Sequence, residues 1–333
     1  MLKDTKPRFA ILDPLRFVAA LAVLLYHYSI YLDEAFPVLV STFKFGYLGV
    51  NFFFILSGFV IMASAQNRTA TEFLFARALR IYPAFIICLA FTLLIAWWLN
   101  GETTSIVAVL ANATILNDYF SIANVDGVYW TLQAEIKFYC CVFLLLATGL
   151  FQYWRHWLCG WLVTAIAYYF SSQPFFLSWF INPQYSFYFI GGICAYLLNK
   201  NKSDYLVKVL FFTSGLFAIL IAREQTNSFM VNVGGIERNV AAILVGVIFL
   251  FFYFLANGYF NIKKTASYLL LGSISYPLYL IHGRAGKSLI DSLLGVFGLS
   301  AIFVVVLIIL CVSIFVIYCE NYTVRLIRRL TRL

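Results

Sequence analysis

Apolar residues occur along this chain in blocks of about twenty, separated by short polar connections. A block of roughly twenty residues, wound as an α-helix, crosses the roughly 30 Å hydrocarbon core of a bilayer. Runs such as 301–318 show no alternation of apolar and polar positions, which disfavours the strands of a transmembrane β-barrel. The pattern therefore predicts an all-α polytopic membrane protein.

Ten of these blocks predict about ten transmembrane helices. They cover residues 10–31, 46–65, 82–100, 128–150, 154–171, 179–198, 206–223, 238–256, 266–283 and 298–320. A further stretch, 103–120, is only moderately apolar and carries Asn112, Asn117 and Asp118, so we interpret it as a re-entrant or surface helix. The apolar signal is weakest in 154–171 and 179–198.

Basic residues are divided unequally between the alternate connections of this ten-helix pattern. One side collects sixteen Lys and Arg residues and the other side five, with Arg16 and Lys137 inside predicted helices. Because Lys and Arg accumulate in cytoplasmic loops, we predict that both termini are cytoplasmic. If one helix had been missed or added, the basic residues would no longer fall mostly on one side. The asymmetry therefore supports an even number of crossings.

Composition agrees with the membrane assignment and narrows the functions. Hydrophobic residues make up 63% of the 333-residue chain and charged residues 11%, where a soluble domain would have roughly 25% charged residues. The net charge of +9 comes from basic residues in connections, which excludes nucleic acid as the expected partner. The seven cysteines lie in apolar segments without zinc-ligand spacing, so no metal site is predicted. We expect a single membrane domain over 1–333, with an uncleaved first helix and no appended soluble domain.

The first predicted helix carries two ionisable residues that hydrocarbon tolerates poorly. Arg16 and His27 are eleven residues apart, so they return to within about 20° of one helix face, roughly 16 Å apart along the axis. Ionisable groups inside membrane helices indicate functional sites, and histidine suits proton transfer near neutral pH. The alternatives are an Arg16 that snorkels to the interface and a His27 that is a hydrogen-bonded core residue.

A second ionisable group lies in the predicted helix 128–150. Glu135 falls about two turns below the outer end of this helix, at a depth similar to that of His27. A carboxylate beside an imidazole orients the ring and stabilises its protonated form. We therefore hypothesise that Glu135 orients His27. Pairing of Glu135 with a neighbouring cation, or contact with the interface, is the alternative.

Two arginines precede the third predicted helix on its cytoplasmic side. Arg77 and Arg80 are three residues apart and lie on adjoining positions of one helix face. Two guanidinium groups on one face suit a phosphate-bearing cofactor. An anchor that follows the positive-inside rule explains them equally well.

Two polar residues occur near the ends of the last two predicted helices, 266–283 and 298–320. His282 lies near the outer end of predicted helix 266–283, where we expect it to add a second polar group to an outer cavity. Glu320 closes the last helix before a basic tail, where pairing with Arg325 or Arg328 is expected.

Five segments, read in order, resemble motifs of the acyltransferase-3 family of membrane acyltransferases. They are LDPLRFVAA at 12–20 with Tyr26 and His27 after it, GVNFFFILSGF at 49–59, FARALRIYP at 75–83, WTLQAE at 130–135 with Phe138 and Tyr139 after it, and LGSISYPLYLIH at 271–282. Asn51 and Ala76 depart from the motifs, which commonly have an aspartate and an arginine there. One such motif is a weak signal, but five in the same order are specific.

The resemblance implies transfer of an acyl group, usually acetyl, from cytoplasmic acetyl-CoA to a hydroxyl of an envelope glycan. It implies a multi-pass protein of the inner membrane that resembles stand-alone O-acetyltransferases of lipopolysaccharide O-antigen. The expected partners are acyl-CoA, a glycan or lipid-linked glycan, and the bilayer. The residues assigned by this resemblance are His27 and Glu135 for catalysis, Arg16, Arg77 and Arg80 for the donor, and Asn51, Ser57, Trp130, Tyr139 and His282 for substrate binding.

Two mechanisms and one rival function remain at this point. His27 removes the proton from the sugar hydroxyl, a contribution of roughly 10²–10⁴-fold, or His27 briefly carries the acyl group itself. In the rival class, a transporter or flippase, Arg16, His27 and Glu135 would line a substrate path or proton relay. The inverted repeats typical of many transporters are not evident in the sequence.

Overall fold

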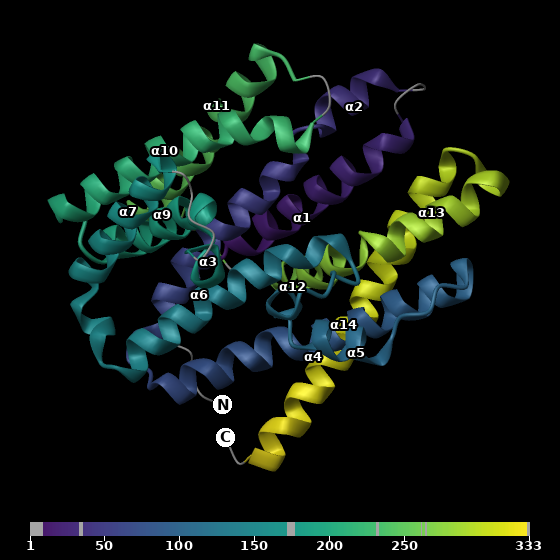
Figure 1. The fold of residues 1–333 in the computed structure, drawn as a ribbon, viewed down its shortest axis with the longest axis horizontal. Coiled ribbons are helices and arrows are strands. Elements are labelled where there is room, and N and C mark those ends of the chain that lie inside the picture. Colours follow the sequence, from purple (N-terminus) through teal and green to yellow (C-terminus); the bar gives the residue numbers. More distant parts are fainter. Residues whose placement is uncertain are drawn as a thin grey trace.

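The computed structural model describes residues 9–32, 36–171, 177–230, 233–260, 262–263 and 265–331, and within these ranges it contains helices and no strand. The α-helices are α1 (Leu12–Tyr28), α2 (Pro37–Phe43), α3 (Gly49–Ala65), α4 (Ala70–Asn100), α5 (Ile106–Ala113), α6 (Trp130–Ala147), α7 (Trp154–Phe170), α8 (Leu177–Phe180), α9 (Pro183–Lys200), α10 (Tyr205–Phe229), α11 (Gly235–Ala256), α12 (Ala266–Ile281), α13 (Arg284–Phe297) and α14 (Ser300–Thr331). Figure 1 shows them as one bundle.

A helix lies in each of the ten segments predicted to cross the membrane. Seven segments of the described chain are long and apolar enough to do so: Leu12–Leu32, Pro37–Ala65, Ala70–Asn100, Gly127–Ala147, Tyr205–Phe229, Gly235–Ala256 and Ser300–Leu330. The other three are α12, which is apolar but shorter, α7 and α9. The all-helical, multi-pass membrane character is confirmed, whereas the number of ten crossings stays a prediction.

The weak apolar signal of α9 has a structural reason. Fifteen of its eighteen residues are buried, because α3, α7, α10 and α11 pack against it. A helix surrounded by other helices does not need an apolar surface toward lipid. Its contact with α3 is close: a Cβ added at Gly192 would lie 1.8 Å from the Ile55 carbonyl oxygen, and one at Gly58 would lie 2.1 Å from that of Phe189. Small residues permit such approach between membrane helices.

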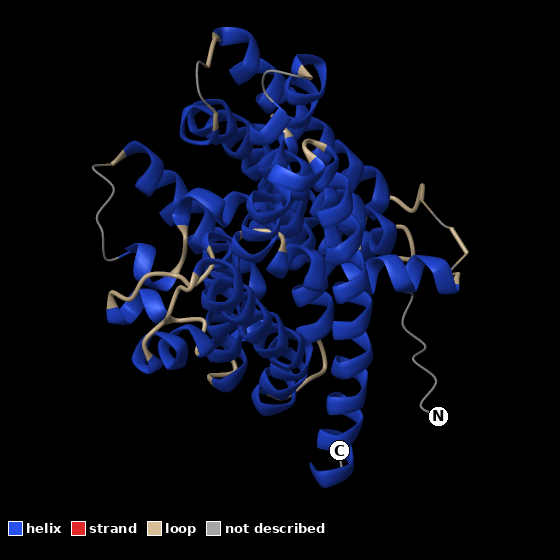
Figure 2. Cartoon of the chain, turned by 90° about the vertical axis from the view of Figure 1, so that its right-hand side faces the viewer, coloured by secondary structure: helices blue, strands red, loops and turns tan. Residues whose placement is uncertain are grey.

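The helices form a central group and two flanks (Figure 1). α1 packs against α3 and α12 in the centre, and α6 contacts α3 and α4. One flank is α7, α9, α10 and α11, and the other is α4, α13 and α14. Figure 2 shows the same bundle from the side.

The first and last membrane helices fix the two sides of the bundle. Tyr28, at the end of α1, lies against Gly286 of α13 near Ile309 in the first half of α14. The start of α1 and the end of α14 therefore lie on the same side, which we call inner after the predicted orientation. At that side Arg80 of α4 pairs with Glu320 of α14 at 3.5 Å. The expected pairing of Glu320 with arginines of its own helix was wrong, because Arg80 approaches from the neighbouring helix.

The segment between α4 and α6, which we call the cover segment, packs along α4 and the outer half of α6 and against the start of α13. α5 has only eight residues, too short to cross a bilayer, as expected for 103–120. Asn112 accepts a hydrogen bond from the Val125 amide at 2.9 Å and donates one to the Ala123 carbonyl at 3.0 Å. Asp126 accepts hydrogen bonds from the amides of Arg284 and Val128. Burial raises the pKa of this carboxyl, and the bonds hold the segment against α6 and α13.

Candidate active site

A cavity of about 110 Å³ lies between α1, α3, α4, α6 and α12, and we call it the central cavity. Its ionisable and hydroxyl-bearing side chains include Arg16, Ser57, Arg77, Arg80, Glu135 and Tyr139. The three arginines and Glu135 come from three different helices, α1, α4 and α6. The structure therefore brings together the predicted donor-binding residues and one of the two predicted catalytic residues.

The carboxylate of Glu135 is held by two hydroxyl groups. Ser57 of α3 donates a hydrogen bond to Glu135 Oε1 at 2.7 Å, and Tyr139, one turn further along α6, donates to the same oxygen. Ser57 and Tyr139 were expected to bind substrate. The structure shows that they line the cavity and position Glu135 in it.

The two arginines of α4 differ in what they contact. Arg77 donates from Nη2 to Ser64 Oγ at 3.1 Å, and its buried Nε has no hydrogen-bond partner among the residues described. Arg80 pairs with Glu320, and its guanidinium lies 5.8 Å from the centre of the Tyr276 ring. A buried donor without a partner is costly. Arg77 therefore has a buried donor to offer to a ligand, and Arg80 keeps N–H donors besides the nitrogen paired with Glu320.

Arg16 connects the central cavity to the inner side of the bundle. It also lines a second cavity, of about 270 Å³, whose polar residues include Asp13, Gln66, Asn199 and Lys200. We call this the inner cavity. Because one side chain belongs to the walls of both cavities, Arg16 faces the protein interior as expected for a functional residue.

His27 and His282 face each other at the outer ends of α1 and α12. His27 Nδ1 lies 2.9 Å from His282 Nε2, and His282 Nδ1 lies 2.7 Å from the carbonyl oxygen of Tyr279. A carbonyl only accepts, so His282 Nδ1 carries the proton and the neutral ring accepts at Nε2 from His27 Nδ1–H. The assignment leaves the lone pair of His27 Nε2 available to accept a proton.

The partner of His27 is therefore His282, and the prediction that Glu135 orients His27 was wrong. Tyr279 lies between the two groups: it lines the central cavity, its hydroxyl bonds with Thr131 at 3.0 Å, and its ring centre is 5.3 Å from that of His282. Depth in the membrane follows from the position of a residue in its helix. The direction in which the side chain points depends on helix packing.

The remaining two predicted residues have other neighbours. Asn51 donates to the Tyr188 hydroxyl at 2.6 Å and ties α3 to α9, so the structure places it outside the walls of the central cavity. Trp130 packs against Phe54 and Tyr185, with ring centres 6.1 and 5.1 Å apart, respectively. Asn51 is thus a contact between helices in this structure.

Sequence reasoning missed the contribution of the two tyrosines of α12 to the site. Tyr276 and Tyr279 of α12 line the central cavity together with Thr131 of α6. Their three-residue spacing, continued by His282, places all three on one helix face. That periodic stripe was the available signal.

Comparison with known proteins supports the resemblance seen in the motifs. The sequence model of the acyltransferase-3 family, described as an acyltransferase domain, matches residues 9–319. ORF330 of Acidianus two-tailed virus, whose name is that of an acetyltransferase, is 26% identical over 312 residues, 90% of this chain and 87% of that protein.

Two further relatives match shorter stretches. Nodulation protein 10 of Rhizobium leguminosarum bv. viciae is 31% identical over 183 residues, 46% of this chain and 48% of that protein. The O-acetyl transferase of Shigella phage Sf6 is 30% identical over 142 residues, 38% and 43% of the two chains. No solved structure gives a significant match.

Proposed function

The chain belongs to the acyltransferase-3 family and is a membrane acyltransferase, and we propose that it transfers an acetyl group from cytoplasmic acetyl-CoA to a hydroxyl of an envelope glycan. The observation that carries this proposal is a basic central cavity, which shares Arg16 with the wall of the inner cavity, and a histidine pair that lies beyond Tyr279 at the outer ends of α1 and α12. The proposed location is the inner membrane, with ten crossings and both termini in the cytoplasm.

The donor side of this proposal rests on charge. Acetyl-CoA carries several phosphate oxygens, which guanidinium groups bind with paired, charge-assisted hydrogen bonds. Arg16, Arg77 and Arg80 supply three such groups around one cavity, and Lys200 lies in the wall of the inner cavity. We propose that the donor enters through the inner cavity and that its thioester lies near Tyr279.

The chemistry is a direct transfer with His27 as general base. The glycan hydroxyl gives its proton to His27 Nε2 while its oxygen bonds to the thioester carbonyl carbon. The carbon–sulfur bond then breaks, and the CoA thiolate leaves and takes up the proton from His27. His282 keeps the proton of His27 on Nδ1. Glu135, held by Ser57 and Tyr139, offsets the positive charge of the arginines as a positioning residue.

The acceptor that we propose is lipopolysaccharide O-antigen. The name of the phage relative, an O-acetyl transferase, supports a hydroxyl oxygen as the acceptor atom. The outer position of the histidine pair supports an acceptor that approaches from the side opposite to the donor.

Acetyl transfer by the purified protein tests the proposal. Labelled acetyl-CoA and de-O-acetylated lipopolysaccharide are given to the protein in detergent. We expect labelled glycan from the wild type and a roughly 10²–10⁴-fold lower kcat for His27→Ala. His156→Ala, at an exposed position of α7, is the matched control. An active His27→Ala variant would refute the general-base role, an acetyl group trapped on His27 would replace it with a covalent route, and glycan movement without acetylation would favour a transporter.

A further inference from the structure

A third cavity, of about 350 Å³, opens between α6, the start of α9 and the end of α10, and we call it the outer cavity. Its volume falls in the range of roughly 300–1,000 Å³ that is typical of small-molecule sites. It lies at the outer ends of these helices, opposite to the inner cavity. The chemical character of its walls indicates what it would hold.

An ion pair lies in the wall of the outer cavity. Lys137 Nζ lies 2.6 Å from Asp118 Oδ2, and the Lys137 side chain is only 8% exposed. The Asp118 side chain is 36% exposed, and solvent screens an ion pair with an exposed member, so this pair is weak evidence for stability. Its presence in a cavity wall instead points to recognition of a polar ligand. Because the pair has no net charge, it favours a neutral ligand over a phosphate.

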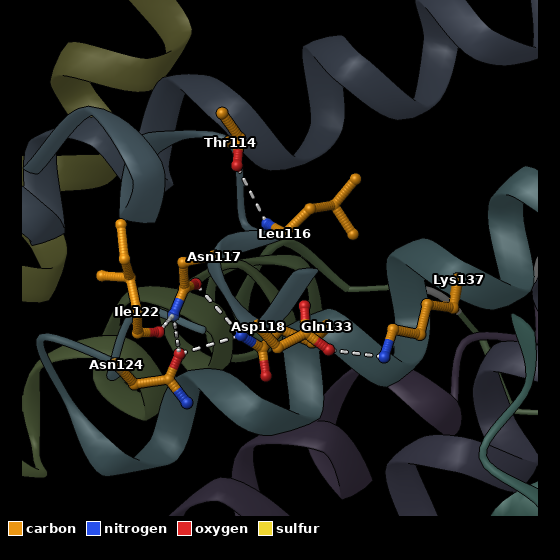
Figure 3. Close-up of polar contacts among 8 residues, drawn as sticks. All are labelled: Thr114, Leu116, Asn117, Asp118, Ile122, Asn124, Gln133 and Lys137. Carbon is orange, nitrogen blue, oxygen red and sulfur yellow. Dashed lines mark hydrogen bonds and ion pairs between the residues drawn. The ribbon is translucent and has the colours of Figure 1, made fainter. Parts of the chain in front are cut away.

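Carboxamides supply further polar groups to the walls. Gln133 donates hydrogen bonds to the side-chain oxygens of Asn117 at 3.0 Å and Asn124 at 2.9 Å, and Asn117 donates to the Ile122 carbonyl at 2.7 Å. Figure 3 shows these residues with Asp118 and Lys137. This network fixes the wall before any ligand binds. An amide has donors and an acceptor, which match hydroxyl groups that act as both.

Aromatic rings form the apolar part of the cavity. The rings of Trp130 and Tyr185 are 5.1 Å apart, and both lie near Phe54 at the border of the central cavity. Such rings offer flat, rigid apolar faces with a polar edge. A combination of ring faces, amides and a neutral ion pair suits a pyranose ring, which has apolar C–H faces and a rim of hydroxyls.

Tyr26 links the wall of the outer cavity to the histidine pair. Phe229, in that wall, accepts a hydrogen bond at its carbonyl oxygen from the Tyr26 hydroxyl, and the Tyr26 and His27 rings are 5.0 Å apart. Helix α6 separates the outer cavity from the central cavity. Gln133 and Lys137 face the outer cavity, whereas Glu135 faces the central one.

We propose that the outer cavity is a binding subsite for a neutral sugar residue of the acceptor glycan, adjacent to the sugar whose hydroxyl reacts at His27. The assignment of the glycan as acceptor rests on the proposed function. A subsite of this kind acts on acceptor binding and leaves donor binding unchanged.

One hydrogen bond of the wall offers a matched pair of variants. Gln225 of α10 donates to Gln184 Oε1 at 2.9 Å, and only Gln184 lines the cavity. Gln184→Ala and Gln225→Ala therefore remove the same hydrogen bond between helices. For Gln184→Ala we expect the KM for de-O-acetylated lipopolysaccharide to rise about three- to tenfold, the range of one neutral hydrogen bond. Its KM for acetyl-CoA should stay unchanged, and Gln225→Ala should change neither constant. Equal effects of the two variants, or a rise in the KM for acetyl-CoA, would overturn the assignment.

A binding measurement without acetyl-CoA separates this inference from the proposed function. Thermal stabilisation of the purified wild type is measured with the neutral methyl glycosides of glucose, galactose and rhamnose, and with inorganic phosphate. We expect stabilisation by at least one glycoside, retained in Gln225→Ala and lost in Gln184→Ala. That result supports the sugar site even if the protein transfers no acetyl group. The absence of acetyl transfer would refute only the proposed function. Stabilisation by phosphate alone, or by no probe, in a protein that transfers no acetyl would refute the sugar site.

Discussion

The central cavity and the outer cavity lie on two faces of the same helix and differ in charge. The central cavity gathers three arginines around the single carboxylate of Glu135. The outer cavity contains one internally neutralised pair, Asp118 and Lys137, among amides and rings. An excess of positive charge in a low-dielectric site suits a polyanion. A neutral polar site suits a ligand rich in hydroxyl groups. In the proposed function, the difference separates a donor side from an acceptor side.

The two histidines belong to neither wall. His27 lies at the end of α1 and His282 at the end of α12. Tyr279 lies between His282 and the central cavity, and Tyr26 lies between His27 and the outer cavity. The groups proposed to react are thus placed by one pair of helices, while α6 separates the two ligands. Variants in each region should therefore change different kinetic constants.

The largest effect in this comparison is expected at the histidine pair. His282→Ala removes the group that accepts from His27 Nδ1–H, and we expect kcat to fall about 100-fold, at the lower end of what general base catalysis contributes. Both KM values should stay near those of the wild type. His282→Gln retains a hydrogen-bond acceptor and should recover part of the rate. Its pH profile of kcat/KM should lie between those of the wild type and His282→Ala. If both variants lose activity equally and melt at lower temperature, the role of His282 is structural.

The next largest effect is expected for donor binding in the central cavity. Hydrogen bonds to charged groups contribute about 1.5–3 kcal/mol, so Arg77→Ala should raise the KM for acetyl-CoA about tenfold or more. The KM for the glycan should not change. Arg68→Ala is the control, because Arg68 also donates to Ser64 Oγ, at 2.9 Å, and does not line the cavity. Equal losses in both variants would trace the effect to Ser64.

The smallest effect is expected at the exposed rim of the cover segment. A hydrogen bond from Arg284 lowers the pKa of Glu102 from its ordinary value. The stabilisation is therefore present above the unfolded pKa, about 4.3, and is lost as pH falls through the folded one. It is small because solvent screens exposed pairs. Glu102→Gln should slightly reduce the loss in melting temperature between pH 7 and pH 4. If the KM for the glycan rises in this variant, Glu102 also contributes to acceptor binding.

Much of the fold could be predicted from the apolar pattern. Hydrocarbon demands long apolar helices, so the positions of α1, α4 and α14 follow from the sequence. α9 gave a weaker signal, because its surroundings are other helices rather than lipid. α13 was not anticipated as a separate helix, since 284–297 lacks the continuous apolar run of a membrane segment.

The sequence predicted which residues belong to the candidate site better than it predicted which of them contact each other. Arg16, Arg77 and Arg80 were expected together near the inner side, and they line one cavity. His27 was expected beside Glu135, and it faces His282 instead. Lys137 was noted only as an ionisable residue within a helix, and its partner Asp118 comes from a segment nineteen positions earlier.

The sequence by itself determined the membrane helices and the level of each ionisable group along them. The rise of a helix fixes how deep each residue lies in its own helix, and the low polarity of lipid acts on every residue in the same way. The sequence thereby marked Arg16 and His27 as residues that require a function. Only the tertiary structure decided their neighbours. The rotation of each helix about its axis depends on side-chain packing with helices distant in sequence, as at Gly58 and Gly192. That rotation turned Glu135 toward the arginines and His282 toward His27.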